Sequence, residues 1–318
     1  PYWDAIKNIT LGQVISSGSM NDVYTVNEDP NLVVRLLKPK YESKPLTVAN
    51  ELHGYGIQKY FSSGLFGDPD HGCNKIGKIY QYGQIKDSNR LYSIMDRIHG
   101  DELQTVLESI LNGSRPLLAD SDIKQLFLTI CRSIYCLHIE NTGHFDIKPE
   151  NIMVEEGNNI KLIDFGLATD QFDKLVHARV GTPRYMAPET KISGLVDIKA
   201  DIWSLGMLLW IIVTVNRKSD SWNKLYKVNV MEEMYANLKR MHRGLYNTEA
   251  IWKQKQEEYV MYHSRFIFAD VQKNIKKYLC DKTRSCVGQV PVEKWVIDLL
   301  TRVFVPAQDR IGIVAILE

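Results

Sequence analysis

Short runs of β-branched and aromatic residues, separated by Gly, Asn, Asp and Pro, characterise the first 95 residues of the chain. Runs of this kind are typical of antiparallel strands. The expected strands cover residues 22–26, 32–37, 79–82 and 91–95. One helix, at about residues 46–60, is expected to interrupt them. This part of the chain therefore predicts a small sheet with one main helix.

After Gly100 the apolar positions recur every three or four residues, as in amphipathic helices. The clearest case is residues 121–138, where Ser121 or Asp120 is the expected N-terminal cap. The longest apolar run, residues 203–215, is shorter than the roughly 20 residues of a bilayer span. It predicts a buried helix. The pattern as a whole predicts an α+β fold with two lobes.

The change of pattern places the boundary between the lobes. We expect a sheet-rich N-lobe over residues 1–96 and a helical C-lobe over residues 97–318. The junction at residues 94–100 is then a hinge, where pockets form readily.

Composition adds few constraints. The 318 residues, 44% hydrophobic and 24% charged, are typical of a soluble globular protein with two domains or one two-lobed unit. A net charge of +1 gives no overall reason to expect nucleic-acid or membrane binding. Because no signal peptide is recognisable, we expect a cytoplasmic protein, in the producing cell or in a host cell if it is a secreted effector.

The five cysteines are odd in number and contain no Cys-x-x-Cys pair. Neither a disulfide framework nor a zinc site is therefore indicated. The sequence predicts free thiols in a reducing compartment.

Two acids, an amide and a lysine form the most informative motif. Residues 144–151 read His-Phe-Asp-Ile-Lys-Pro-Glu-Asn, and residues 164–166 read Asp-Phe-Gly. Asp146 can accept the proton of an attacking hydroxyl, while Asn151 and Asp164 can hold Mg²⁺ or Mn²⁺ beside a triphosphate. Phosphoryl transfer needs such positioning of metals and nucleophile more than it needs covalent chemistry. The motif thus predicts phosphoryl transfer from a triphosphate to a hydroxyl group.

In this order the two motifs closely resemble the catalytic loop and metal-binding turn of protein kinases. Residues 91–100 are similar to the last N-lobe strand and hinge of that family, and residues 181–189 to the end of its activation loop. Residues 201–206 are similar to the start of its buried central helix. The chain resembles a divergent eukaryotic-type serine/threonine protein kinase whose departures fit a bacterial or viral enzyme.

The resemblance assigns roles at the nucleotide site. Met95 would be the gatekeeper, and the backbone groups of Asp96 and Ile98 would bind adenine. The remaining nucleotide contacts would come from the phosphate-covering loop and from apolar residues above and below the base: Ile15, Gly18, Val23, Val33 and Met153.

The resemblance also assigns roles around the reacting groups. Lys148 is the mark of serine/threonine-specific members, and Thr182 would bind Asp146 and Lys148. Structural roles fall to Asp201, which would brace the catalytic loop, and to Glu189, which would pair with Arg310.

Three positions depart from the family pattern. The first is the phosphate-covering loop, where Ser16, Gly18 and Asn21 stand at the places of three glycines. Gly18 still allows the backbone to approach a phosphate closely. Asn21 tolerates a left-handed backbone better than most residues. The loop is expected to cradle phosphates less permissively.

The second departure is Arg35, which stands where the family has a lysine that anchors the α- and β-phosphates. We expect Arg35 to take this role, paired with Glu51; Glu42 is a weaker partner. Strand alternation points Lys38 to the opposite face. A one-residue bulge that turns Lys38 inward is the competing possibility.

The third departure is Phe145, where many members carry an arginine that receives a phosphate from the activation loop. Between Asp164 and Gly181 the only hydroxyl residue is Thr169. The phosphate receiver and the usual phosphate-bearing residue are both missing. We therefore expect an activation segment that becomes active without phosphorylation.

Residues 216–290 occupy more chain than the family usually has there. They carry 15 Lys and Arg against 8 Asp and Glu, with helices expected at residues 231–243 and 251–261. One interpretation is an extra helical layer with a solvated basic face. The other is a docking surface for an acidic protein or an anionic membrane. Nucleic acid is not expected as a partner, since no binding motif is recognisable.

The sequence thus predicts a serine/threonine protein kinase that acts on a protein substrate. Asp146, Lys148, Arg35 and Glu51 are the expected catalytic residues, with ATP and Mg²⁺ as cofactors. One alternative is a pseudokinase scaffold that binds nucleotide without transferring phosphate. The other is a kinase of antibiotics or choline, which would not be expected to carry residues 181–189.

Overall fold

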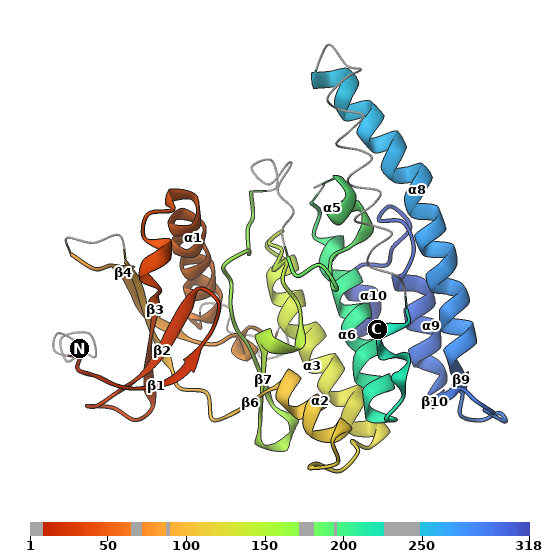
Figure 1. The fold of residues 1–318 in the computed structure, drawn as a ribbon, viewed down its shortest axis with the longest axis horizontal. Coiled ribbons are helices and arrows are strands. Elements are labelled where there is room, and N and C mark those ends of the chain that lie inside the picture. Colours follow the sequence, from red (N-terminus) through yellow and green to blue (C-terminus); the bar gives the residue numbers. More distant parts are fainter. Residues whose placement is uncertain (1–8, 65–71, 87–89, 172–180, 194–195, 226–248) are drawn as a thin grey trace.

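The computed structural model of the chain describes residues 9–64, 72–86, 90–171, 181–193, 196–225 and 249–318. A sheet-rich part and a larger helical part lie side by side (Figure 1). The expected α+β arrangement is confirmed. The helix expected at residues 231–243 falls outside the described residues.

The N-terminal sheet has five strands in the order β1-β2-β3-β5-β4, all antiparallel. Its strands are β1 Leu11–Ser17, β2 Asn21–Val26, β3 Leu32–Leu37, β4 Ile79–Gln84 and β5 Leu91–Asp96. Strands β2 and β3 pair without a register shift, and Val23 lies opposite Arg35. Because side chains alternate along a strand, this regular pairing excludes the bulge that would turn Lys38 inward.

Helix α1 (Pro45–Ser62) covers one face of this sheet, as Figure 1 shows. The inward residues Val33, Leu37 and Met95 pack in one cluster with Tyr55 of the helix. On the other face Val34 and Leu36 belong to a separate cluster. The alternation in β3 thus decides which side chains reach the space between the lobes.

The helical part is built around α6 (Lys199–Asn216). Among the described residues, α6 is the one helix long and apolar enough to cross a membrane, but 94% of it is buried inside the protein. It is a core helix, as its sequence predicted. Around it lie α2 Leu103–Leu111, α3 Asp120–His138, α5 Pro188–Ser193, α8 Glu249–Tyr278, α9 Lys294–Val303 and α10 Val314–Leu317.

Small sheets and 3₁₀ turns complete the helical part. Strands β6 (Gly100–Glu102), β7 (Ile152–Glu155) and β8 (Ile160–Leu162) form one antiparallel sheet. Strands β9 (Leu279–Asp281) and β10 (Val290–Val292) form a parallel pair. The 3₁₀ turns are η2 Pro39–Tyr41, η4 Cys73–Lys75, η5 Pro149–Asn151, η6 Glu156–Asn158 and η7 Asp220–Asn223.

The start of α3 corrects one expectation. The cap residue is Ala119, and no side chain caps the helix. Asp120 instead pairs with Arg217 at 2.5 Å and with Lys282 at 2.9 Å. The Asp120 carboxylate, which the local sequence predicted as a cap for the helix, therefore forms tertiary ion pairs instead.

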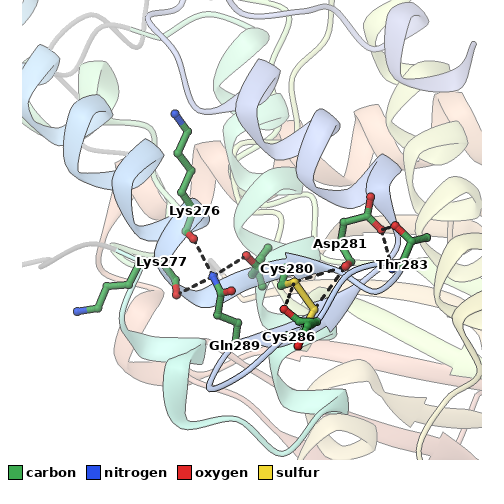
Figure 2. Close-up of a disulfide and its surroundings, with 9 residues drawn as sticks. Lys276, Lys277, Cys280, Asp281, Thr283, Cys286 and Gln289 are labelled. Atoms are coloured by element: carbon green, nitrogen blue, oxygen red, sulfur yellow. Dashed lines mark hydrogen bonds between the residues drawn. A yellow bond between two sulfur atoms is a disulfide. The ribbon is translucent and has the colours of Figure 1, made fainter.

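Helix α8 contains the helix expected at residues 251–261 and is much longer than predicted. It runs along the outer edge of the helical part and projects beyond it (Figure 1). At its end, the Gln289 amide donates to the carbonyls of Lys276, Lys277 and Leu279 at 2.9–3.2 Å (Figure 2). These bonds satisfy carbonyl groups that a helix end leaves without partners.

The prediction of five free thiols is wrong. Cys73 and Cys136 form a disulfide between η4 and α3, with Cα atoms 5.3 Å apart. A second disulfide, Cys280–Cys286, closes the loop after β9 (Figure 2). Cys131 is free and buried. Sequence spacing carries no signal for a pairing across 63 residues, because only the fold brings the two Cα atoms within bonding range. Because Cys131 is the one free cysteine among the described residues, the cysteines give no support to the expected reducing compartment.

Candidate active site

Asp146 lies at the centre of a hydrogen-bond network. One carboxylate oxygen, Oδ1, accepts bonds from the backbone N–H and the hydroxyl of Thr182 at 2.9 and 2.7 Å. The other, Oδ2, accepts from Lys148 Nζ at 2.6 Å and from Asn151 Nδ2 at 3.1 Å. Lys148 also donates to the Thr182 hydroxyl at 2.9 Å. The carboxylate is thereby held in one orientation, and the expected contacts of Thr182 are confirmed.

Asp201 holds the backbone that carries Asp146. Its two carboxylate oxygens accept the N–H groups of His144 and Phe145, both at 2.8 Å, and the ring of His138 lies 3.0 Å away. Phe145 has φ 61°, a left-handed backbone that is uncommon for a bulky side chain. The buried Asp201 therefore stabilises a strained turn, as its expected structural role requires.

Phe145 packs into the hydrophobic core of the helical part, where it is 6% exposed. A Cβ atom added at Gly143 would lie only 2.2 Å from the Phe145 ring. The ring therefore needs glycine beside it. A position that could hold an arginine for a phosphate is used here for core packing.

Asn151 and Asp164 flank Asp146 with oxygen atoms suited to a hard cation. Asn151 uses its Nδ2 for bonds to Asp146, which leaves its Oδ1 as a free acceptor among the described contacts. Asp164 likewise has one oxygen, Oδ2, that makes no described bond. Two protein oxygens plus nucleotide phosphates fit Mg²⁺, which retains several waters and needs no all-protein cage. The side chains present therefore fit a divalent cation.

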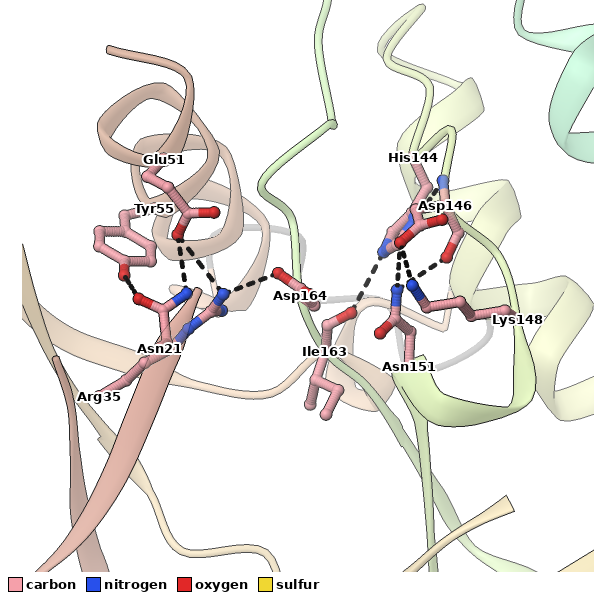
Figure 3. A network of polar contacts seen from close by, with 10 residues as sticks. All are labelled: Asn21, Arg35, Glu51, Tyr55, His144, Asp146, Lys148, Asn151, Ile163 and Asp164. Carbon is pink, nitrogen blue, oxygen red and sulfur yellow. Dashed lines mark hydrogen bonds and ion pairs between the residues drawn. The ribbon is translucent and has the colours of Figure 1, made fainter. Parts of the chain in front are cut away.

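Arg35 joins the two halves of the site. Its Nη2 lies 2.8 Å from Asp164 Oδ1 and 3.4 Å from Glu51 Oε2 (Figure 3). The sequence-predicted pair of Arg35 with Glu51 is thus brought together, with Asp164 as a second partner. Lys38 points to the other face, where it pairs with Asp22 at 3.4 Å and bonds Ser17 in the phosphate-covering loop. Glu42 lies at the end of η2 and is not the partner of Arg35.

Burial and the Arg35 charge oppose each other at these carboxyl groups. Burial would raise the pKa of Asp164, but the guanidinium of Arg35 lowers it below its ordinary value of 3.8. Burial raises the pKa of Glu51, against the effect of the same guanidinium. Asp164 therefore stays ionised at neutral pH and ready for a cation. Its contribution to stability is present above the ordinary pKa and is lost as the pH falls through the lowered value.

The apolar nucleotide residues are divided between the lobes. Val33 and Met95 share one buried cluster, and Val23 packs against it. Met153 lies half-buried on β7, outside this cluster. Ile15 on β1 is 45% exposed.

The backbone N–H groups of the hinge and loop residues differ in whether they already have a partner. The N–H of Ile98 has no partner among the described residues, whereas the N–H of Asp96 donates to the Lys78 carbonyl at 3.0 Å. In the phosphate-covering loop, Gly18 donates its N–H to the Asn21 carbonyl at 2.9 Å, which closes a turn. These positions are compatible with the roles predicted for them.

The expected pair of Glu189 and Arg310 is present at 2.7 Å. The Arg310 side chain is fully buried and also donates to the carbonyls of Lys199, Val303 and Val305. This pair fixes the segment after residue 181 to the helical part.

Gly54 sets how closely α1 approaches the Asp164 segment. A Cβ atom there would lie 2.1 Å from the carbonyl oxygen of Phe165, which is backbone and cannot turn aside as the end of a flexible side chain can. We expect Gly54→Ala to displace α1, lengthen the distance between Arg35 and Glu51, and reduce phosphoryl transfer by about 10-fold or more, as for other small misplacements of a site.

Gly56→Ala is the matched control for this prediction, since it lies in the same helix and gains the same helix propensity. Its added Cβ would meet only the end of the Tyr82 side chain, where the hydroxyl lies nearest at 3.2 Å. Steady-state rates of the two variants provide the measurement. Equal activity in both would contradict the role given to Gly54.

Comparison with known proteins agrees with this geometry. The family model described as "Protein kinase domain" matches residues 72–318, more than half of the chain. Calcium-dependent protein kinase 4 of Plasmodium berghei is 35% identical over 144 residues, which cover 44% of this chain and 26% of that protein. CBL-interacting protein kinase 12 of Oryza sativa is 35% identical over 134 residues, 41% of this chain and 24% of that protein. The matches thus span about a quarter of these relatives.

A solved structure resembles nearly the whole fold. A chain in the structure of the CAK complex from Chaetomium thermophilum bound to ATP-γ-S superposes with a TM-score of 0.63. The similarity covers 99% of this chain and 91% of that chain, at 20% sequence identity. At this identity the likeness concerns the fold, which has the same two lobes.

Proposed function

The chain belongs to the protein kinase family, and from that premise we propose that it transfers the γ-phosphate of ATP to a serine or threonine hydroxyl of a protein. The observation that carries this proposal is the network of Asp146, Lys148 and Thr182, with Asn151 beside it. These contacts gather a carboxylate, an ammonium group and an amide oxygen, which supports a base, a cation and a metal ligand at one site. A scaffold that only binds nucleotide has no physical need for this arrangement.

Each residue of the network has a distinct task. Asp146 orients the substrate hydroxyl and takes up its proton, while Lys148, 2.6 Å from Asp146, offers positive charge to the transferring phosphoryl group. Asn151 and Asp164 would hold Mg²⁺, or Mn²⁺, which neutralises charge on the phosphates when bound. Arg35 anchors the α- and β-phosphates with its planar guanidinium.

The bond between Arg35 and Asp164 is the observation that favours the alternative, a pseudokinase scaffold. At 2.8 Å this pair engages Oδ1 of Asp164, one of the two oxygens that the carboxylate could offer to a metal. The other oxygen and Asn151 Oδ1 remain available, so catalysis is the stronger conclusion. The two functions differ in whether phosphate leaves the nucleotide.

The test is incubation of the protein with labelled ATP, Mg²⁺ and a generic basic protein, followed by phosphoamino-acid analysis. Label on serine and threonine is expected, and Asp164→Ala should lose it. Nucleotide binding without any transfer would instead establish the scaffold. Label on tyrosine would exclude the role given to Lys148.

We also propose that the activation segment needs no phosphorylation. Thr169 is 6% exposed, and its hydroxyl accepts the N–H of Gln171 at 3.0 Å. Phe145, at the place of the phosphate receiver, lies in the core. We expect full activity from protein that carries no phosphate within residues 164–189, before and after phosphatase treatment. Mass spectrometry that finds a phosphate there on all active molecules would refute this.

The exposed basic side chains at the end of α8 are proposed as a docking surface for an acidic protein or an anionic membrane. Lys273, Lys276 and Lys277 are exposed, and Arg284 follows in the next loop. Clustered charge of one sign steers association in a salt-dependent way. We expect retention on anionic liposomes that falls with salt and is lost when the three lysines are changed to glutamate.

The control for this experiment reverses three exposed lysines elsewhere: Lys40, Lys44 and Lys124. Both triple variants change the net charge equally. A loss of retention in both would indicate general charge attraction, and no retention of the wild type would leave an acidic protein as the partner to be sought.

A further inference from the structure

Asn21 occupies the place of the third glycine in the phosphate-covering loop, yet its role is not conformational. It begins β2 with a backbone that does not have positive φ. The expectation that its tolerance of a left-handed backbone matters here is therefore wrong. Its side chain is 6% exposed and lies against Arg35, Glu51 and Tyr55 (Figure 3).

The orientation of the Asn21 amide follows from the donors around it. As drawn in Figure 3, Nδ2 donates to Glu51 Oε2 at 3.3 Å and Oδ1 accepts from Tyr55 at 3.5 Å. With the amide turned by 180°, its oxygen accepts from Arg35 Nε at 3.0 Å and from Nη2 at 2.7 Å. The second orientation is favoured, because a guanidinium has only donors and would otherwise face another N–H group. In either orientation the Asn21 amide binds a member of the ion pair, Glu51 as drawn and Arg35 after the turn.

The donors of Arg35 can then be accounted for one by one. Nε and one side of Nη2 face the Asn21 oxygen, and Nη2 also reaches Asp164 and, at longer range, Glu51. Nη1 makes no bond among the described residues. The side chain is 11% exposed, so the guanidinium is almost enclosed. The protein thus binds the edge of the guanidinium formed by Nε and Nη2, and Nη1 remains available for a phosphate.

A lysine at this place would not need Asn21. Its ammonium has three donors, which Glu51, Asp164 and a phosphate oxygen can satisfy. An arginine brings five donors in a fixed plane, and a buried donor without a partner is costly. A glycine at position 21 would leave Nε facing space rather than an acceptor. The two departures from the family pattern, Arg35 and Asn21, thus have one physical explanation.

We propose that Asn21 is the positioning residue for Arg35: its amide oxygen fixes the guanidinium plane so that Nη1 faces the nucleotide phosphates. This inference rests on the proposed function only in taking a nucleotide as the ligand. Phosphate transfer itself is not required for it.

The test is a double-mutant cycle in which calorimetry measures the affinity for MgADP. Asn21→Gly is expected to weaken binding by about 10- to 100-fold, the range for lost hydrogen bonds to a charged group. In an Arg35→Lys background the same change should have less than about a 3-fold effect. Coupling of this kind isolates a pairwise interaction. The same cycle with Lys124→Ala, an exposed lysine of α3, in place of Arg35→Lys is expected to show no coupling.

Asn21→Asp provides a second variant that keeps an oxygen at the same place, and it should retain binding within about 3-fold of the wild type. Thermal unfolding of each variant reports whether the fold is kept. If Asn21→Gly weakens binding equally in the wild-type and Arg35→Lys backgrounds, or if Asn21→Asp binds as poorly as Asn21→Gly, the proposal is overturned.

The cycle also separates this inference from the proposed function. If the two substitutions are coupled in MgADP affinity but the protein transfers no phosphate, the role of Asn21 stands and the proposed kinase activity is contradicted. If the protein transfers phosphate but the substitutions are not coupled, the kinase activity stands and the role of Asn21 is contradicted.

Discussion

Asp164→Ala is expected to lower phosphoryl transfer by about 10³-fold or more. Metal stabilisation of transition-state charge contributes several kcal/mol, and each 1.4 kcal/mol corresponds to a factor of about ten in rate. Asp164 provides a free oxygen for the cation and also bonds Arg35 at 2.8 Å. Its removal therefore affects the metal and the phosphate anchor together. Initial rates over a range of Mg²⁺ concentrations provide the measurement.

Asp164→Asn is the better matched variant, because Asp164 has φ 62° and asparagine tolerates this backbone more easily than alanine. It keeps the shape and one oxygen but loses the charge. We expect it to need more Mg²⁺ than the wild type and to remain slow at saturation. A wild-type rate and an unchanged Mg²⁺ requirement in Asp164→Asn would show that the cation does not bind at this carboxylate.

Glu189→Ala is expected to reduce the free energy of unfolding by about 3–5 kcal/mol, the cost of leaving one partner of a buried ion pair alone. Arg310 is fully buried, and its Nη1 and Nη2 reach the two oxygens of Glu189 at 2.7 and 3.3 Å. The carbonyls that also accept from Arg310 do not neutralise its charge. Urea unfolding of purified protein provides the measurement.

The matched control is Asp101→Ala, which removes the partner of Arg115 in a pair whose side chains are 48% and 43% exposed. Pairs of this kind contribute about 0–1 kcal/mol, since water screens both charges. A clear difference between the two variants is expected. If Glu189→Ala costs no more than Asp101→Ala, the pair with Arg310 does not hold this part of the fold.

Local features of the site could be predicted because they depend on neighbours in sequence. Strand alternation in β3 put Arg35 and Lys38 on opposite faces, and the regular pairing with β2 agrees. The family resemblance identified Arg35 as the residue that faces the site. The spacing within residues 144–151 brought Asp146, Lys148 and Asn151 together. The family resemblance added Asp201, Glu189 and Arg310 from distant positions. Their contacts are those expected.

Asn21 was missed, although one signal was present. Two positions of the nucleotide site, 21 and 35, depart from the family pattern, and both have side chains that form several hydrogen bonds. Local sequence explains position 21 only by its backbone and position 35 only by its charge. The structure shows that the two side chains touch.

By itself, the amino-acid order determined the two-lobed architecture and the alternation of side chains along the predicted strands, residues 22–26, 32–37, 79–82 and 91–95; strand β1 was not among them. These properties follow from periodicity, which the chain carries in every conformation. The roles of Arg35 and Glu51 came instead from the family resemblance. Only the tertiary structure decided the disulfides of Cys73 and Cys280, the ion pairs of Asp120 and the contact between Asn21 and Arg35. Each of these depends on how closely two surfaces approach when the chain folds, and composition or spacing does not specify that distance.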